Sequence, residues 1–443
     1  MAIQSASEVD QELAIKYYST TTPPLPLVFK LFLPDFIVEE IALDGTAVKA
    51  SFAAPSNLSI NWGRGYTVYR LEKHARDTLA TLKRLQKIFN TRHIGCSGLK
   101  DRYAVTSQLI TVKEGAPPPK RLPIGLYLEK VGSSFQPLKP GALRGNHFSI
   151  IGRMLENEPR VSLEEVLREF EEQLHAFGLL NYYGYQRFGT MRPISHRAGK
   201  LLLLAKYEEL LDLLLFQALP TECLEVRGVK ALAAPRKIQF LPPFLTYEKK
   251  LLKHLASGVS PREAVKHLSK RLQLFLVQAY QAFLFNKILS ARIEEQDLPL
   301  APLPGDKVAM LTSWGSPARI VEASSSNLLK LQKLIESGKA ALALPVPGSM
   351  KPSPSSSPPA RLMAAVLEEE QISLRHFKDF FPSLKGGWRI CVVKPKEFRV
   401  EVRKDPLTRS LAAHLGFFLP SGSYATMLLR ELVKPLNPFL AGL

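Results

Sequence analysis

The chain contains little cysteine and no long apolar run, and both shortages narrow what it can be. Only three cysteines occur in 443 residues, and the wide spacing of Cys96, Cys223 and Cys391 fits neither a disulfide framework nor a zinc site. No segment reaches the roughly 20 consecutive apolar residues of a membrane helix. The N-terminus shows no signal peptide, and the nine histidines are not clustered as metal ligands. We therefore expect a soluble cytoplasmic protein that binds neither membrane nor metal.

Acidic residues are also scarce relative to basic ones. Lys and Arg total 59 against 40 Asp and Glu, so the net charge is +19. Such an excess favours a polyanionic partner, either nucleic acid or an anionic membrane surface. Because no membrane segment is visible, nucleic acid is the default expectation. The length predicts two or three domains, and the 46% apolar content is ordinary for a folded protein.

A short loop carries the strongest candidate for chemistry. Gly95 and Gly98 permit a tight, irregular backbone, and Asp101 then follows between Lys100 and Arg102. Flanking cations favour the ionised carboxylate, which suits a nucleophile or base at neutral pH. The alternative is a surface loop in which the aspartate only caps a turn.

Apolar periodicity predicts the regular elements. Strands are expected at 35–41, 66–71, 109–112, 146–153 and 398–403, and helices at 71–89, 163–174, 201–215, 272–293 and 428–433. Ser162 and Gly178 should bound the second helix, and Ser421 or Ser423 should cap the last one. The N-terminus of that last helix could contact RNA phosphate, or its cap could be purely structural. The Pro- and Ser-rich residues 345–359 are expected to form a loop or linker.

Two segments have a composition suited to RNA. The predicted helix at 71–89 bears cations, among them Lys73, which could be solvated or could hold phosphates. The block 181–189 reads Asn-Tyr-Tyr-Gly-Tyr-Gln-Arg-Phe-Gly, with aromatic, amide and guanidinium groups that stack on and hydrogen-bond to unstacked bases. The alternative for this block is an aromatic-rich turn in the core.

Taken together, these blocks resemble the TruD family of pseudouridine synthases. Seven of them occur in family order: 35–41, 70–73 with 77–78, 98–108, 145–148, 181–189, 279–286 and 419–432. They span nearly the whole chain, and the length is more similar to the archaeal and eukaryotic branch than to the bacterial one.

The resemblance implies an α+β fold, with a catalytic core whose mixed sheet is mostly antiparallel. Residues 1–195 and 389–443 would form that core, and 196–388 would form an inserted family-specific α/β domain. RNA would lie in the cleft between the domains. We expect a monomer whose partner is tRNA and which needs no cofactor and no metal.

The resemblance also implies a reaction, the isomerisation of uridine to pseudouridine in tRNA, usually at position thirteen. The family's catalytic aspartate falls on Asp101. Tyr183 would stack on the base, Asn181 would orient the site, and an aromatic residue near the C-terminus, Phe417, would also contact RNA. Further expected RNA contacts are Lys73, Lys100, Arg102, Gln186 and Arg187.

This sequence departs from the family in two places. Relatives often have Glu at the position of Tyr185 and Phe at that of Tyr183, and the segment before the first strand is Pro-rich where many relatives are Gly-rich. Neither change removes Asp101, so we expect activity to survive. Two alternatives remain: a protein that keeps the fold and binds RNA without catalysis, and a synthase that acts on another RNA.

Overall fold

The computed structural model describes residues 2–52, 54–114, 121–155, 162–189, 192–219, 224–231, 242, 245–298, 300–350 and 356–443. The chain divides into two compact units, each made of three segments. The helical unit comprises Met1–Tyr18, Asn181–Ala309 and Ile320–Cys391, and the sheet unit comprises Ser19–Leu180, Met310–Arg319 and Val392–Leu443.

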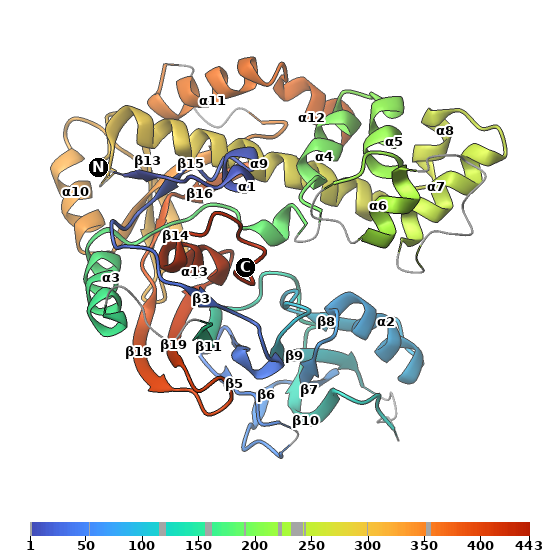
Figure 1. The fold of residues 1–443 in the computed structure, drawn as a ribbon, viewed down its shortest axis with the longest axis horizontal. Helices are drawn as coiled ribbons and strands as arrows, with labels where there is room; N and C mark the ends of the chain where they lie inside the picture. The colour runs from blue at the N-terminus through green and yellow to red at the C-terminus, as the bar shows by residue number, and fades with distance from the viewer. Residues whose placement is uncertain are drawn as a thin grey trace. The chain divides into compact units, whose positions relative to one another are not determined.

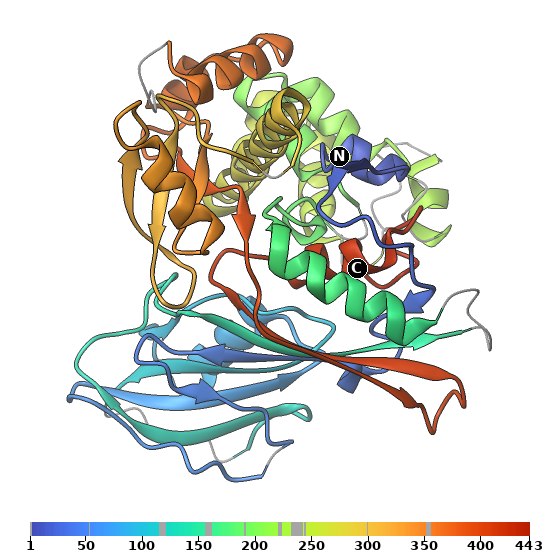
Figure 2. The ribbon, with the colours of Figure 1, turned by 90° about the vertical axis from the view of Figure 1, so that its left-hand side faces the viewer.

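The sheet unit is built on one large mixed sheet (Figure 2). Among the described residues its main path runs β18 (Lys396–Lys404), β19 (Leu411–Pro420), β11 (Gly145–Met154), β4 (Phe36–Ile41), β9 (Val105–Lys113), β7 (Tyr66–His74), β10 (Leu126–Ser134) and β6 (Ile60–Trp62). Shorter strands flank it: β3 (Leu27–Val28), β5 (Ala47–Val48) and β8 (Ile94–Cys96). The pairs β4–β9 and β6–β10 are parallel and the other recorded pairs are antiparallel, which confirms a mixed, mostly antiparallel sheet.

The centre of this sheet is buried on both faces. Every residue of β9 except the last is buried, because apolar groups cover it from two sides. One face packs Leu71 and Ile110 against Leu85 of α2 (Thr78–Ile88), while the other packs Val68 and Leu109 against neighbouring strands. The alternation of side chains along a strand thus places consecutive β7 residues in different surroundings.

The first predicted helix begins later than expected. Residues 71–74 continue β7, and α2 starts at Thr78 because Asp77 caps it, its Oδ1 accepting from the Ala80 N–H at 2.8 Å. Pairing of β7 with β9 and β10 outweighs the helical spacing that Leu71 shares with later residues.

Two helices of the sheet unit test the capping predictions. Ser162 caps α3 (Leu163–Phe177), and Gly178 ends it at φ +73°, both as predicted. The cap prediction for α13 (Ala425–Val433) is wrong: the N-cap is Tyr424, whose side chain makes no capping hydrogen bond, and Ser421 and Ser423 lie outside it. The first turn of α13 is buried, so it offers no exposed N–H groups to RNA phosphate.

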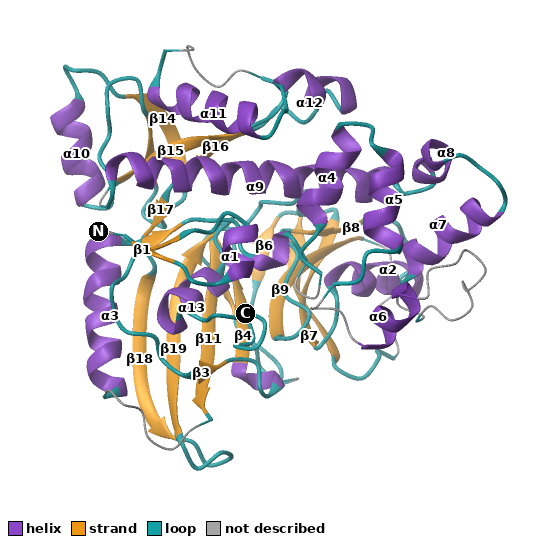
Figure 3. Cartoon of the chain, turned by 45° about the horizontal axis from the view of Figure 1, so that its top comes forward, coloured by secondary structure: helices purple, strands orange, loops and turns teal. Residues whose placement is uncertain are grey.

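The helical unit is organised around α9 (Lys270–Gln296), the long helix of Figures 1 and 3. Its helices besides α9 are α1 (Glu8–Glu12), α4 (Ser195–Leu203), α5 (Tyr207–Leu215), α6 (Leu224–Ala231), α7 (Thr246–Ala256), α8 (Pro261–Lys266), α10 (Leu328–Glu336), α11 (Pro358–Glu369) and α12 (Leu374–Phe380). Most residues of α9 from Leu276 onward are buried, which confirms the predicted core helix. The single helix predicted at 201–215 is wrong, because the chain turns at Ala205, φ +55°, and separates α4 from α5.

The remaining elements are short. They are β1 (Ile3–Gln4), β2 (Tyr17–Tyr18), β12 (Leu179–Leu180), β13 (Lys307–Leu311), β14 (Pro317–Glu322), β15 (Ala340–Val346), β16 (Gly387–Ile390) and β17 (Val392–Val393), with 3₁₀ turns at Leu33–Asp35 and Tyr185–Arg187. The predicted linker at 345–359 overlaps the end of β15 and the start of α11, and its residues 351–355 lie outside the described part. No described helix is both long enough and apolar enough to cross a membrane.

Candidate active site

Asp101 lies on the loop that joins β8 to β9 in the sheet unit, and its side chain is partly exposed. Gly95 lies in β8, just before this loop, and close packing requires a glycine, since a Cβ on it would lie 2.4 Å from the Leu138 carbonyl oxygen. Gly98 meets no such constraint, because a Cβ on it would have nothing within 4 Å. Of the two glycines that the sequence analysis singled out, only Gly95 is thus explained by packing.

Lys73 holds the backbone of this loop. Its Nζ donates to the carbonyl oxygens of Asp101 at 2.6 Å, Arg76 at 2.8 Å and Lys100 at 3.4 Å. Burial lowers the pKa of Lys73 to about 8, and the negative charges of Asp101 and Asp77 oppose that shift. Lys73 has no exposed surface, so it positions the loop and does not present a charge to RNA as the sequence analysis expected.

Lys100 is also turned inward. Its Nζ lies 3.0 Å from Glu40 Oε2 and also contacts Asn146 Oδ1. The other oxygen of Glu40 accepts from Ser97 Oγ at 3.0 Å and from the Leu109 N–H at 3.3 Å. The Lys100 ammonium group is therefore buried and paired with Glu40. It is not exposed to neutralise a phosphate, as the sequence analysis expected.

A second lysine that interacts with Asp101, Lys30, was not predicted from the sequence. The Lys30 ammonium lies 4.6 Å from the centroid of the Phe36 ring. Burial lowers the pKa of Lys30, and the nearby Asp101 carboxylate opposes the shift. Lys30 and Lys73 thus both interact electrostatically with the Asp101 carboxylate. Nothing in the spacing of Lys30 links it to residue 101, because β4 and β9 bring the two segments together.

Three other side chains of the loop, those of Leu99, Arg102 and Tyr103, face outward. Leu99 is 60% exposed and Tyr103 is 58% exposed, while Arg102 is exposed with its guanidinium 5.3 Å from the Tyr103 ring centroid. A partly exposed carboxylate is therefore bordered by an apolar, a cationic and an aromatic group. Contact of Arg102 with RNA phosphate stays a prediction that this exposure permits.

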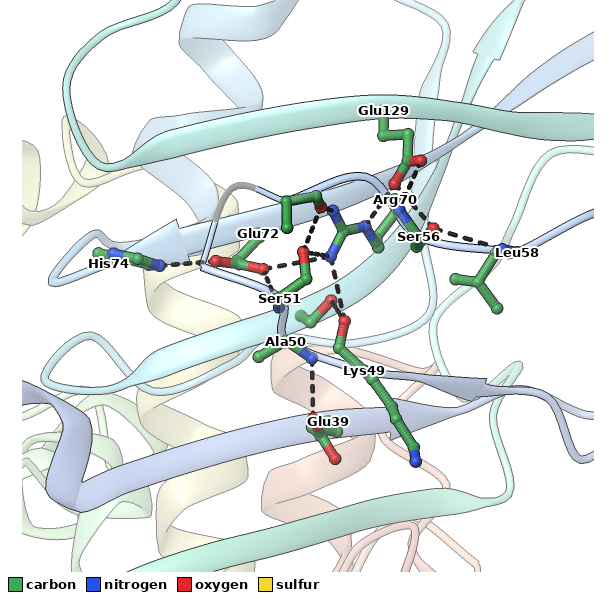
Figure 4. A network of polar contacts seen from close by, with 12 residues as sticks. Glu39, Lys49, Ala50, Ser51, Ser56, Leu58, Arg70, Glu72, His74 and Glu129 are labelled. Carbon is green, nitrogen blue, oxygen red and sulfur yellow. Dashed lines mark hydrogen bonds and ion pairs between the residues drawn. The ribbon is translucent and has the colours of Figure 1, made fainter.

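The face of β7 opposite to Lys73 is held by the polar network drawn in Figure 4. Arg70, 3% exposed, donates to Glu129 Oε2 at 2.8 Å, to Glu72 Oε2 at 3.2 Å and to the Ala54 carbonyl at 2.9 Å. Glu72 also lies 2.8 Å from His74 Nε2. Because side chains alternate along β7, this network anchors the strand from one face while Lys73 reaches the Asp101 loop from the other.

The block 181–189 belongs to the helical unit, where its aromatic residues have two different environments. Tyr182, Tyr185 and Phe188 are buried, which fits the core-turn interpretation for them. The Tyr182 hydroxyl hydrogen-bonds to Ser290 at 3.0 Å, and Tyr185 donates to Asp10 Oδ1 at 2.5 Å.

Tyr183 is only partly buried. The Arg389 guanidinium lies 4.0 Å from its ring centroid, and the Tyr183 backbone N–H donates to Asn286 Oδ1 at 2.9 Å. Asn181 is buried; it donates to the Ile390 carbonyl at 2.9 Å and accepts from Arg389 at 2.7 Å. Asn181 thus orients Arg389 over Tyr183. No local pattern in the sequence points to Arg389, which lies about 200 residues away from this block.

Gln186 and Arg187 are partly buried beside Tyr183 in the chain. Arg187 donates to Gln278 Oε1 at 3.3 Å, and its guanidinium lies 5.4 Å from the Phe275 ring centroid. Their contact with RNA stays a prediction.

Phe417 does not have the position that the sequence analysis expected. It has no exposed surface in β19, and its ring stacks on Phe148 at 5.3 Å and on Phe398 at 6.2 Å between centroids. Its partners are core side chains of the sheet unit, so no ring face is open to a nucleotide.

Among the described residues, no three His, Cys, Asp or Glu side chains come together as a possible metal site. Cys391 is buried, and Cys223 lies outside the described part of the chain. The chemistry that this arrangement offers is that of a carboxylate held next to cations.

Comparison with known proteins shows which family this chain is similar to. The model of the family "tRNA pseudouridine synthase D (TruD)" matches residues 12–432. Two proteins named "Probable tRNA pseudouridine synthase D" are similar over nearly their whole length. The one from Pyrobaculum arsenaticum is 31% identical over 99% of this chain and 100% of its own. The one from Pyrococcus furiosus is 33% identical over 94% of this chain and 98% of its own.

A solved structure agrees with this. The crystal structure of the "putative tRNA pseudouridine synthase D (TruD)" of Methanosarcina mazei superposes with a TM-score of 0.74 at 27% identity, covering 98% of this chain and 99% of that one. The family match, the similarity to curated relatives and the similarity in structure all extend over the whole fold, and the chain belongs to the tRNA pseudouridine synthase D family.

Proposed function

We propose that Asp101 is the catalytic carboxylate with which this pseudouridine synthase isomerises uridine in tRNA, and that its target is the uridine at position thirteen. One observation carries the proposal: a partly exposed carboxylate stands on a loop whose carbonyl groups the buried Lys73 holds in place, and it interacts electrostatically with Lys73 and with the half-buried Lys30. A preorganised charge of this kind costs no rearrangement when the substrate arrives.

The reaction rearranges bonds within one nucleotide. The N1–C1′ bond breaks, the uracil turns, and C5 forms a new bond to C1′. C5 gives up its proton, and N1 gains one. Product and substrate contain the same atoms, so no external oxidant, reductant or group donor is needed. The Asp101 carboxylate can either attack C1′ or remove a sugar proton, and both routes require it to be negatively charged.

The target uridine must first leave its base stack, which costs a few kcal/mol. The exposed Tyr103 and Arg102 beside Asp101 offer groups that can stack on an adjacent base and pair with a phosphate. In the helical unit, Tyr183 with its Arg389 neighbour is the proposed stacking residue, and Gln186 and Arg187 are proposed RNA contacts.

The proposal includes a division of the chain into a catalytic domain and an inserted domain. The proposed catalytic domain comprises 1–195 and 389–443. The segment carrying Asp101 and the C-terminal strands both belong to the sheet unit, which supports a domain formed from both ends of the chain, although residues 1–18 and 181–195 fall in the helical unit. Residues 196–388 would then be the family-specific insertion. We further propose that the enzyme acts in the cytoplasm as a monomer.

The decisive experiment is pseudouridine mapping on unmodified tRNA transcripts after incubation with the wild type and with Asp101→Asn. We expect a single new pseudouridine at position thirteen with the wild type and none with the variant. Binding of tRNA by the variant should stay within about threefold of wild type, because the amide keeps the shape of the side chain.

A transcript with cytidine at position thirteen is the matched substrate control and should remain unmodified. Substantial isomerisation by Asp101→Asn would remove Asp101 from the catalytic role. Modification at another uridine would leave that role intact and refute the proposed position.

A further inference from the structure

The helices α7 and α8 of the helical unit, labelled in Figure 1, have a sequence unusually rich in Lys and Arg. Residues 245–271 contain seven Lys and Arg against two Glu, a net +5 in 27 residues, whereas the whole chain carries +19 over 443. This local density is several times the average of an already basic protein. It therefore calls for an explanation beyond overall composition.

The few carboxylates of this region do not neutralise it. Glu248 is paired with Arg192 and Glu263 with Lys266. The exposed side chains of Lys250, Lys253 and Arg262 form no ion pair or hydrogen bond within the part of the chain that the structure describes. Three cations are thus available to an external anion.

Two histidines join these cations into one surface. The rings of His254 on α7 and His267 at the end of α8 lie parallel, with centroids 3.6 Å apart. Lys250 and Lys253 lie within four residues of His254 on α7, and Arg262 lies on α8, which ends just before His267. We call Lys250, Lys253, His254, Arg262 and His267 the α7–α8 basic surface.

The packing beneath fixes this surface. Leu251 and Leu252 of α7 are buried together with Ala264 and Val265 of α8, so the two helices hold their charged faces in a defined arrangement. A rigid array of like charges costs free energy in the absence of a partner, and it loses little side-chain freedom when a partner binds.

The first turn of α9, the next helix, also carries positive charge that costs free energy. Lys270 and Arg271 are exposed in the first turn of α9, which contains no acidic residue. Cations at a helix N-terminus oppose the macrodipole and typically cost a few tenths of a kcal/mol each. A stretch that breaks a local stability rule without a compensating contact is typical of a functional surface.

We infer that the α7–α8 basic surface is an accessory binding site for the phosphate backbone of tRNA, separate from the catalytic loop. It rests on the function proposed above, since that function supplies the polyanion. RNA is favoured over an anionic membrane because the surface presents ring faces together with its cations. The stacked histidines and the 48%-exposed Tyr247 can contact bases or ribose, whereas a membrane contact needs apolar side chains that insert.

The test compares two triple variants of the full chain. One is Lys250→Gln, Lys253→Gln and Arg262→Gln, which removes three charges from the surface. The matched control is Lys330→Gln, Lys333→Gln and Lys339→Gln, which removes three exposed charges on and just after α10. Binding of an unmodified tRNA transcript is measured by fluorescence anisotropy over a range of KCl concentrations.

We expect the surface variant to bind tRNA about tenfold more weakly than wild type and the slope of log Kd against log[KCl] to fall by about 2 to 3, since each lost phosphate contact reduces it by about 0.9. The control should stay within about twofold of wild type. Equal affinities and equal slopes for the two variants would overturn the inference. Unchanged tRNA binding with a selective loss of binding to phosphatidylserine vesicles would overturn it in favour of a membrane surface.

Turnover separates this inference from the proposed function. The surface variant should keep the wild-type kcat at saturating tRNA, because it leaves the Asp101 loop intact, and this also shows that it is folded. A wild type that binds tRNA but forms no pseudouridine would refute the proposed function, while the comparison of affinities would still decide the role of the surface.

Discussion

At the scale of single residues, the lysine beneath the Asp101 loop is the most informative. Three ammonium N–H groups of Lys73 meet three carbonyl oxygens, so the side chain is fully used in fixing backbone. The sequence placed Asp101 on a loop beside basic residues, and this holds. It could not tell which lysines point inward, because burial depends on strands that pair across long stretches of chain.

Replacing Lys73 should therefore impair turnover more than binding. We expect Lys73→Met to lower kcat about 10- to 100-fold while the Kd for tRNA stays near that of wild type, because the loop loses its anchor and Asp101 its position. Lys83→Met, at an exposed lysine of α2, is the matched control and should leave both constants unchanged. A parallel loss of kcat in the two variants would contradict the anchoring role.

The pH dependence of turnover should report the same lysine. As the pH rises through about 8, Lys73 loses its proton and keeps only two N–H groups for three carbonyls, so we expect kcat to fall. Its pKa is below the value of 10.5 for an ordinary lysine, so in this window the unfolded chain binds more protons than the folded one, and this group makes stability rise with pH. Decreasing kcat with an undiminished melting temperature is the expected signature, and loss of both together would oppose it.

At the scale of elements, local signals worked where a cap or a glycine decides the outcome. The α3 helix begins at Ser162 and ends at Gly178 because both residues act within a few positions. The start of α2 and the break between α4 and α5 were mispredicted, because strand pairing and a positive-φ alanine overrode an apolar periodicity. Contacts such as Lys100 with Glu40 or Asn181 with Arg389 join segments far apart in sequence, and no local pattern reveals them.

The crossing of α4 and α9 gives an element-scale prediction. A Cβ on Gly199 of α4 would lie 2.1 Å from the Leu276 carbonyl oxygen of α9, so the helices approach closely only because this residue is glycine. We expect Gly199→Ala to destabilise the protein by about 1 to 3 kcal/mol, measured as a lower midpoint of denaturant unfolding. Gly228→Ala in α6, where a Cβ meets nothing within 4 Å, is the control. It should be neutral or stabilising by up to about 1 kcal/mol, and a loss equal to that of Gly199→Ala would refute the steric argument.

At the scale of the whole molecule, composition and the order of motifs predicted most. The excess of Lys and Arg indicated a polyanionic partner, and seven blocks in order indicated the family that the comparisons show. The mixed sheet followed from that family and is confirmed, whereas the inward orientation of Phe417 was not foreseeable from its motif. The sequence pattern around an aromatic residue in a strand is the same whether its ring faces a ligand or the core.

The pairing of β11 with β19 has a consequence for biosynthesis. β11 ends at Met154 and β19 begins at Leu411, so more than 250 residues are translated before β11 can pair with β19. At roughly 5 to 20 residues per second, the ribosome needs about 10 to 50 s for that interval. Throughout it one edge of β11 lacks its neighbour and can pair with another nascent chain. The enzyme's yield in the cell should therefore depend on chaperones that shield this edge until the last segment emerges.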